Sequence, residues 1–289
     1  MKTRLLIALA LLLALVGGAG YWVYRDTLVP VPLAEGVDLY VKASPEFGED
    51  ETRLEALLPA GPEVEAFLAN QSDLTLLQPA PGGAWVGQLV SGLQASRHGL
   101  RWRLTLQPGW RMQNGATLDA AEVKLALRDS VAGLGGDVRI IDASTVDLRF
   151  KDRPENLMKD LAHWRVPGTG PFIRKGFTLS RFDGFIRGKA GVAGLTVFTD
   201  PGLMEGHAWA EGLASGRWAW AAFPERIAAF DMVKARLVAY DEIHLKDGSV
   251  WFLSRRMRRL RPQPEDWTRT RLFGVWKGGT DLPYDPLGL

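Results

Sequence analysis

The chain contains no cysteine in its 289 residues, and this absence excludes several kinds of site at once. There can be no disulfide framework, no thiolate metal site, no nucleophilic thiol and no cysteine for lipoprotein attachment. Histidine is scarce too, and His98, His163, His207 and His244 show neither His-x-x-x-His nor His-Glu-x-x-His spacing. We therefore expect no metal site and no metal cofactor.

Catalytic and phosphate-binding motifs are also missing. The sequence has neither a Gly-x-Ser-x-Gly elbow nor a Gly-x-x-x-x-Gly-Lys-Ser/Thr loop. Gly168-Thr-Gly-Pro171 could be read as an anion cradle, but the proline removes one amide and the pattern favours a rigid turn. A formal net charge of only +2 gives no global attraction to nucleic acid. We expect a non-enzymatic protein with no cofactor and no nucleic-acid partner.

What the chain does have is a long uncharged run at its start. Lys2 and Arg4 precede Leu5 to Tyr24, a run rich in leucine and alanine that ends at Arg25. At a rise of about 1.5 Å per residue this run spans roughly 30 Å of hydrocarbon. Tyr21, Trp22 and Tyr24 would lie at an aromatic belt.

A cleaved signal peptide is the other interpretation of residues 1–25, because Gly17 and Ala19 supply small residues after the apolar core. In both cases Lys2 and Arg4 stay in the cytoplasm and the residues after the apolar run are exported. We expect an inner-membrane protein with one span and a periplasmic domain, or a periplasmic protein after cleavage near Ala19.

The remainder predicts a proline-containing linker followed by one domain. Residues 26–36 hold Pro30 and Pro32 without an amphipathic period, which is typical of an extended linker. Residues 37–289, with 46% hydrophobic and 24% charged residues in the whole chain, are typical of a globular domain. We expect a single compact domain of mixed α/β (α+β) type.

The first part of this domain gives short elements. Val37 to Val41 alternates like a strand, and Glu51 to Leu58 and Pro62 to Ala69 are predicted as short helices. Trp85 to Leu93 fits either a helix or a strand.

The middle of the chain gives clearer signals. Leu100 to Leu106 alternates and places Trp102 and Leu104 on the buried face of a strand. Asp119 can cap a helix whose apolar stripe is Val123, Leu127, Val131 and Leu134. Val138 to Ile141 and Thr145 to Phe150 then predict two strands joined by a short turn.

A hairpin and an arginine run follow near the C-terminal end. Residues 236–261 alternate around Asp247-Gly248, a strong two-residue turn. Five arginines end this segment: Arg255, Arg256, Arg258, Arg259 and Arg261. Such a run is typical of a solvated edge, but in a membrane-held protein it could instead bind anionic lipid head groups.

Eleven tryptophans make the chain rich in indole rings. Such rings usually pack in cores, but they can also line a ligand groove. We predict that Trp110, Trp218 and Trp220 contact the ligand if a groove is present, with core packing as the alternative for each.

Four motifs in order resemble the extracellular solute-binding proteins of family 5, the dipeptide- and oligopeptide-binding type. They are Trp102–Gly109 with Met112, Asn114-Gly115 and Leu118–Val123; Gly168-Thr-Gly-Pro-Phe172; Phe185–Gly188 with Gly194–Phe198; and Gly212–Gly216. The resemblance covers roughly residues 63–222. It implies the scaffold of one lobe of a periplasmic binding protein, lobe I.

Members of this family are much longer, because a second lobe closes over the ligand. The 289 residues show no counterpart of that lobe, and Arg217-Trp-Ala-Trp220 stands where the family has acidic residues. The resemblance implies binding of a peptide-like or small solute in connection with an ABC permease. The alternative is an envelope interaction module that kept the fold and lost ligand binding.

Overall fold

The computed structural model describes residues 24–34, 38–39, 53–80, 83–187, 190, 192–204, 208–215, 217–223, 240–244, 250–254 and 276–277. These residues divide into two compact units. Unit 1 comprises Met1–Ala34, Thr75–Pro108 and Asp119–Val166, and unit 2 comprises Glu35–Leu74, Gly109–Leu118 and Pro167–Leu289. The prediction of one compact domain is therefore wrong, because the chain builds a separate sheet in each unit.

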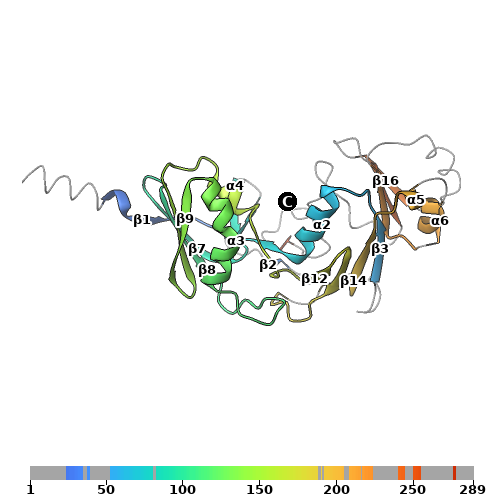
Figure 1. Ribbon diagram of the computed structural model, residues 1–289, viewed down its shortest axis with the longest axis horizontal. Coiled ribbons are helices and arrows are strands. Elements are labelled where there is room, and N and C mark those ends of the chain that lie inside the picture. The colour runs from blue at the N-terminus through green and yellow to red at the C-terminus, as the bar shows by residue number, and fades with distance from the viewer. Residues whose placement is uncertain are drawn as a thin grey trace, which may run out of the picture. The chain divides into compact units, whose positions relative to one another are not determined.

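Unit 1 contains a five-stranded antiparallel sheet in the order β1-β7-β8-β10-β9 (Figure 1). Its strands are β1 (Leu28–Pro30), β7 (Val90–Ser96), β8 (Arg101–Leu106), β9 (Gly136–Asp142) and β10 (Thr145–Phe150). Short elements complete the unit: β5 (Leu77–Pro79), β6 (Trp85–Gly87), α4 (Leu157–Leu161) and β11 (Arg165–Val166), with β4 (Leu74–Thr75) at its boundary.

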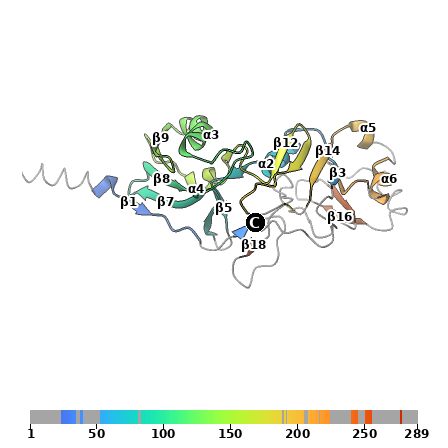
Figure 2. The same cartoon turned by 90° about the horizontal axis from the view of Figure 1, so that it is seen from below.

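Helix α3 (Ala120–Gly133) covers one face of this sheet, as Figure 2 also shows. The predicted cap is confirmed: Asp119 Oδ1 accepts hydrogen bonds from the amides of Ala121, at 2.8 Å, and Glu122, at 3.0 Å. The stripe is confirmed for its first three members, which are fully buried, but Leu134 lies beyond the helix and is exposed.

Unit 1 corrects two further predictions. Leu28–Pro30, expected in a linker, pairs as edge strand β1 with Gln94–Ser96 of β7, where proline is tolerated at the edge of a sheet. Trp102 is half-buried rather than a core residue, while Leu104 on the same face is fully buried. The indole Nε1 of Trp102 donates to the carbonyl of Gly99 at 2.9 Å, so one edge of the ring stays near the β7–β8 turn.

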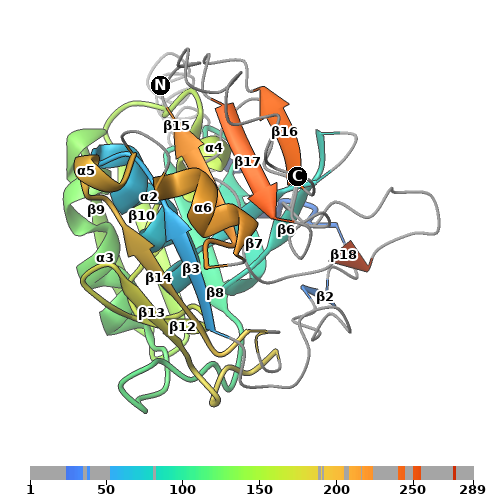
Figure 3. The same ribbon diagram turned by 90° about the vertical axis from the view of Figure 1, so that its right-hand side faces the viewer.

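Unit 2 is built on a mixed seven-stranded sheet in the order β12-β13-β14-β3-β15-β17-β16 (Figure 3). Its strands are β3 (Arg53–Leu57), β12 (Phe172–Lys175), β13 (Thr178–Arg181), β14 (Gly194–Phe198), β15 (Trp220–Phe223), β16 (Tyr240–His244) and β17 (Val250–Ser254). The remaining elements are α2 (Pro62–Ser72), α5 (Pro201–Met204), α6 (Ala208–Ala214) and the pair β2 (Asp38–Leu39) and β18 (Trp276–Lys277).

Strand β3 lies in the middle of this sheet and is parallel to both neighbours, β14 and β15. The helix predicted over Glu51 to Leu58 is therefore wrong. The spacing of Leu54, Leu57 and Leu58 fits a helix, but a central strand is buried on both faces and carries apolar residues in a similar density. Figures 1 and 3 place α2 on one side of the sheet and α5 and α6 on the other.

Other predictions for unit 2 hold. Helix α2 begins at Pro62, as predicted, and extends to Ser72. The C-terminal hairpin is present, with β16 and β17 antiparallel within the expected residues 236–261.

The predicted membrane span, residues 5–24, lies outside the described residues apart from Tyr24. Among the helices that the structure describes, none combines the length and the apolar character needed to cross a bilayer.

Candidate functional site

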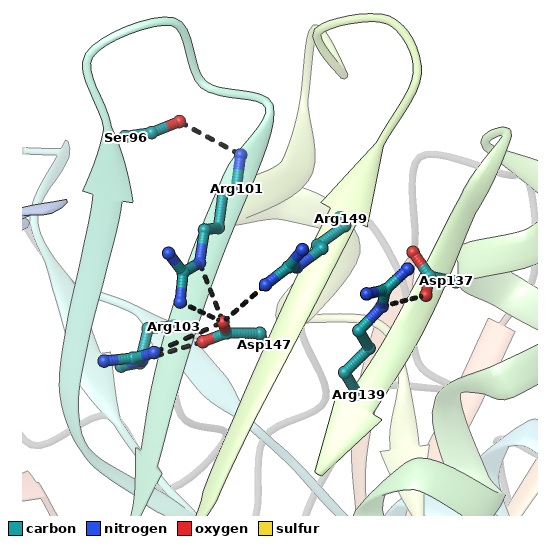
Figure 4. Close-up of polar contacts among 7 residues, drawn as sticks. All are labelled: Ser96, Arg101, Arg103, Asp137, Arg139, Asp147 and Arg149. Atoms are coloured by element: carbon teal, nitrogen blue, oxygen red, sulfur yellow. Dashed lines mark hydrogen bonds and ion pairs between the residues drawn. The ribbon is translucent and has the colours of Figure 1, made fainter. Parts of the chain in front are cut away.

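The most highly charged arrangement in the described structure lies on the face of the unit 1 sheet that α3 leaves open. Arg101 and Arg103 alternate on β8, and Asp147 and Arg149 alternate on β10. The register pairs Arg103 with Asp147 and Arg101 with Arg149, so the four side chains meet on one face. We call this group the Asp147 cluster (Figure 4).

Asp147 accepts contacts from three arginines at once. Arg101 donates from Nε to Oδ2 at 2.7 Å, with Nη2 at 2.5 Å from the same oxygen. Arg103 donates from Nε to Oδ1 at 2.7 Å and from Nη2 to Oδ2 at 3.3 Å. Arg149 Nη2 is 3.9 Å from Oδ2, which is an ion-pair distance and not a hydrogen bond. Figure 4 shows all three side chains directed at the carboxylate.

Burial and charge oppose each other at Asp147. Its side chain is completely covered, and burial alone would raise the pKa of the carboxyl. Hydrogen bonds and positive charge from Arg103 and Arg101 outweigh that effect and hold the pKa of Asp147 below its ordinary value. The same hydrogen bond raises the pKa of Arg103. The carboxylate is therefore ionised at neutral pH, and three arginines share one negative charge.

The Gly168–Pro171 segment is a rigid turn, as the sequence predicts. The amide of Gly168 donates to Asp73 Oδ1 at 2.9 Å, and the amide of Gly170 donates to the carbonyl of Ser72 at 2.8 Å. Thr169 Oγ1 accepts from the amide of Leu74 at 2.9 Å. Because these groups bind the segment after α2, the Gly168 and Gly170 amides are not available to cradle a phosphate.

Gln113 ties a second loop to this turn. Its Nε2 lies within hydrogen-bond distance of three carbonyl oxygens, those of Ser72 at 2.9 Å, Gly170 at 3.1 Å and Phe172 at 2.7 Å. The backbone amide of Gln113 donates to the carbonyl of Gly168 at 2.8 Å. We call Gln113, the Gly168–Pro171 turn and the Ser72–Leu74 segment the turn hub of unit 2.

Trp110 packs against the turn hub rather than in an open groove. Its side chain is 1% exposed, and its Nε1 donates to the carbonyl of Thr169 at 3.2 Å. Phe185 meets the ring edge-on at 5.8 Å between centroids, and the Arg187 guanidinium lies 5.1 Å from the ring centroid. A ring covered in this way cannot stack on a ligand, so the ligand-contact prediction for Trp110 is corrected to a packing role.

Trp218 needs the same correction. The ring is 1% exposed, meets Phe198 at 5.0 Å between centroids and lies under the Arg217 guanidinium at 4.3 Å. A Cβ added at Gly212 would overlap the indole, which explains glycine there in the Gly212–Gly216 motif. For Trp220 the structure describes only the backbone, which pairs with Leu253 and Ala56, and its ligand contact stays a prediction.

The remaining predicted site residues do not gather. Arg255, Arg256, Arg258, Arg259 and Arg261 lie outside the described residues, so their lipid contact also stays a prediction. In the described parts of the chain no three histidine, aspartate or glutamate side chains are grouped to hold a metal ion. His163 Nδ1 lies 2.6 Å from the carbonyl of Lys159, in a local contact at the end of α4.

The Asp147 cluster was not predicted from the sequence, although a signal was present. The alternation in residues 100–106 that predicts the apolar face also places Arg101 and Arg103 together on the other face. Asp147 and Arg149 repeat that spacing on the next strand but one along the chain. Only the pairing of β8 with β10 shows that the two charged faces coincide.

The fold matches several solved structures of solute-binding proteins. The solute-binding protein MoaA from A. tumefaciens R10, in complex with mannopinic acid, matches with a TM-score of 0.54 and 18% identity over 67% of this chain and 49% of that one. A dipeptide-binding protein from Pseudoalteromonas sp. SM9913, in complex with Met-Leu, matches with a TM-score of 0.55 and 14% identity over 67% and 52%. The chain has the solute-binding-protein fold.

NikA from Brucella suis, in complex with Fe(III)-EDTA, matches this fold in the same way, with a TM-score of 0.53 and 17% identity over 66% of this chain and 48% of that one. The resemblance drawn from the four motifs is thus confirmed at the level of the fold.

The similarity to solved structures covers only part of their length, and the other comparisons found no match. The chain spans about half the length of the solved solute-binding proteins that it matches. No protein-family model matches the sequence, and a search of curated proteins found no match either.

Proposed function

We propose that this chain is an exported, membrane-associated solute-binding-type protein that binds a peptide-like or small solute in connection with ABC transport. The observation that supports the proposal is the fold, which two thirds of the chain shares with binding proteins whose structures contain mannopinic acid or Met-Leu.

The proposed location is the inner membrane, with the units on the periplasmic side. The support is the sequence of residues 1–25, where Lys2 and Arg4 precede twenty uncharged residues. A phosphatase fused after Leu289 should be active outside the cytoplasm and should stay with membranes through a high-salt wash. Activity in the soluble periplasmic fraction would instead indicate cleavage near Ala19.

A second candidate function is supported by a specific observation. Trp110 and Trp218, the rings expected to carry ligand binding, are each 1% exposed and packed against unit 2 itself. A chain that spans half of its structural relatives and has these rings buried could serve instead as an envelope interaction module. In that case the fold remains, but solute binding is lost.

Two measurements on the full chain separate these functions. Mass spectrometry of small molecules that co-purify with the chain should detect a solute that disappears after the protein is unfolded and refolded in its absence. Calorimetry with that solute, or with a mixed oligopeptide library, should give weak binding, because Trp110 and Trp218 are buried and cannot stack on a ligand. A chain that carries no molecule and gives no heat with the library would support the interaction module.

A further inference from the structure

One end of the unit 1 sheet brings together segments that are far apart in the sequence. Leu28 at the start of β1 is opposite Ser96 at the end of β7, and Arg101 at the start of β8 is opposite Arg149 near the end of β10. The residues before β1, in the β7–β8 turn and after β10 therefore all lie at this end. The turn itself is tight, with the amide of Gly99 donating to the carbonyl of Ser96 at 2.7 Å.

This end carries an excess of positive charge. Six basic residues form what we call the basic end: Arg25, Arg97, Arg101, Arg149, Lys151 and Arg153. The acidic residues in the same segments are Asp26, Asp137, Asp152 and Glu155. Asp147 pairs with Arg101 of this group and also with Arg103, which adds a further positive charge, so the excess remains.

Two of these cations have no counter-ion in the described chain, because Lys151 and Arg153 are exposed and make no ion pair with another described residue. Arg149 makes only the long ion pair with Asp147, at 3.9 Å. The aliphatic part of Arg153 lies over the β7–β8 turn, where a Cβ on Gly99 would be 3.2 Å from its Cγ. The guanidinium of Arg153 therefore lies beside the turn that carries Arg97.

The chain enters unit 1 at this same end. Arg97 Nη1 donates to the hydroxyl of Tyr24 at 2.6 Å, and the Arg97 guanidinium lies 4.1 Å from the Tyr24 ring centroid. Four residues later Leu28 is already paired in β1. The proposed membrane span ends at Tyr24, so unit 1 follows it without a flexible linker, and the basic end is the part of unit 1 nearest to the span.

We propose that the basic end of unit 1 rests on the outer surface of the inner membrane and binds the phosphate groups of anionic phospholipids. Guanidinium groups bind phosphate oxygens in bidentate geometry, and clustered basic residues next to a membrane span are attracted to anionic lipid. The closeness to Tyr24 favours lipid over an acidic protein partner. This inference rests on the membrane anchor in the proposed function.

Hydrogen exchange on the full chain in nanodiscs tests the contact. Amides of residues 97–101 and 150–153 should exchange roughly fivefold more slowly when phosphatidylglycerol is added to phosphatidylcholine nanodiscs, and high salt should remove the difference. The K151Q/R153Q variant should lose this protection. The matched control K124Q/R128Q, which removes one lysine and one arginine from the exposed side of α3, should keep it.

The outcomes separate the anchor from the lipid contact. Flotation of the chain with phosphatidylcholine vesicles in high salt reports the anchor alone. An inserted chain with equal exchange in both lipids would overturn the lipid contact and leave the anchor intact. A chain that floats only with phosphatidylglycerol vesicles, and only when Lys151 and Arg153 are present, would support the contact and refute the anchor. Protection that requires membrane proteins as well as lipid would indicate an acidic protein and overturn the proposal.

Discussion

The two units differ in the interactions that hold their strands and loops together. Unit 1 carries charged side chains on one face of its sheet, and ion pairs around Asp147 hold β8 to β10 on that face. Unit 2 uses mostly backbone groups at its turn hub, where the Gln113 side-chain amide and the backbone of the Gly168–Pro171 turn make the hydrogen bonds and Asp73 is the one carboxylate that accepts.

The difference predicts how each unit responds to its surroundings. Ion pairs between partly exposed groups weaken with salt and with acid, whereas hydrogen bonds among buried neutral groups do not. The Asp147 cluster of unit 1 should therefore be more sensitive to pH and salt than the turn hub of unit 2. The following substitutions test this contrast.

The largest effect is expected from Trp110→Ala in unit 2. Removing a ring that is 1% exposed should lower the free energy of unfolding by about 4 kcal/mol. The counterpart in unit 1, Trp102→Ala, should cost clearly less because that ring is half-buried. Urea unfolding followed by circular dichroism measures both. Equal losses would show that the two rings do not differ in packing as described.

Gly170→Ala should give the next largest effect. A Cβ at residue 170 would lie 2.5 Å from the carbonyl carbon and 2.6 Å from the carbonyl oxygen of Ser72, so backbone at the turn hub must move. We expect a loss of about 3 kcal/mol in the free energy of unfolding. Gly133→Ala is the control, since its Cβ would meet nothing within 4 Å, and it should be neutral or slightly stabilising.

Asp147→Asn tests the charged face of unit 1. Breaking a buried ion pair costs several kcal/mol, but the arginine side chains here are 27–41% exposed, so we expect a loss of about 2 kcal/mol at neutral pH. Amide exchange in β8 and β10 is a local readout. The control Asp137→Asn removes a pair with Arg139 in which both side chains are about half exposed, and it should change little.

The pH dependence of the same variant has a defined sign. The pKa of Asp147 is lowered in the folded chain, so the carboxylate adds stability above its unfolded pKa of about 3.9. That stability is lost as the pH falls through the folded value. Acidification below about pH 4 should therefore destabilise β8 and β10 more in the original chain than in Asp147→Asn. Parallel acid profiles for the two proteins would contradict the ion-pair description.

Asp119→Ala should give the smallest effect, a loss of about 1 kcal/mol, because two amides at the start of α3 lose their acceptor. Asn156→Ala provides a comparison within unit 1. Asn156 occupies the same position before α4 but makes no side-chain cap hydrogen bond, so its replacement should leave the thermal midpoint unchanged. A similar change in both variants would argue against a specific cap at Asp119.

The sequence predicted local features well where the interacting residues lie close together in the chain. Asp119 and the amides it caps are two and three residues apart, and β9 and β10 are joined by a two-residue turn. The predictions failed where the residues that decide the structure are far away in the sequence. Whether Arg53–Leu57 is a strand depends on β14 and β15, and whether Leu28–Pro30 is a linker depends on β7.

Contacts between distant residues were also missed at the candidate site. Nothing near Trp110 in the sequence indicates that Phe185 and Thr169 cover its ring. The alternation of Arg101 with Arg103 was visible, but its meaning depends on Asp147, more than forty residues later, and on the register between two strands. Long-range pairing decides both cases, and a single sequence does not contain it.

If the chain is exported as proposed, the central position of β3 also sets an order of assembly. All five strands of the unit 1 sheet are complete by residue 150, so that sheet can form while the rest of the chain is still being translocated. Strand β3 emerges even earlier, but its neighbour β14 begins at Gly194, about 140 residues later. In an N-to-C order of emergence this apolar strand stays unpaired until its partners arrive, and that interval is when the chain most needs protection by a chaperone.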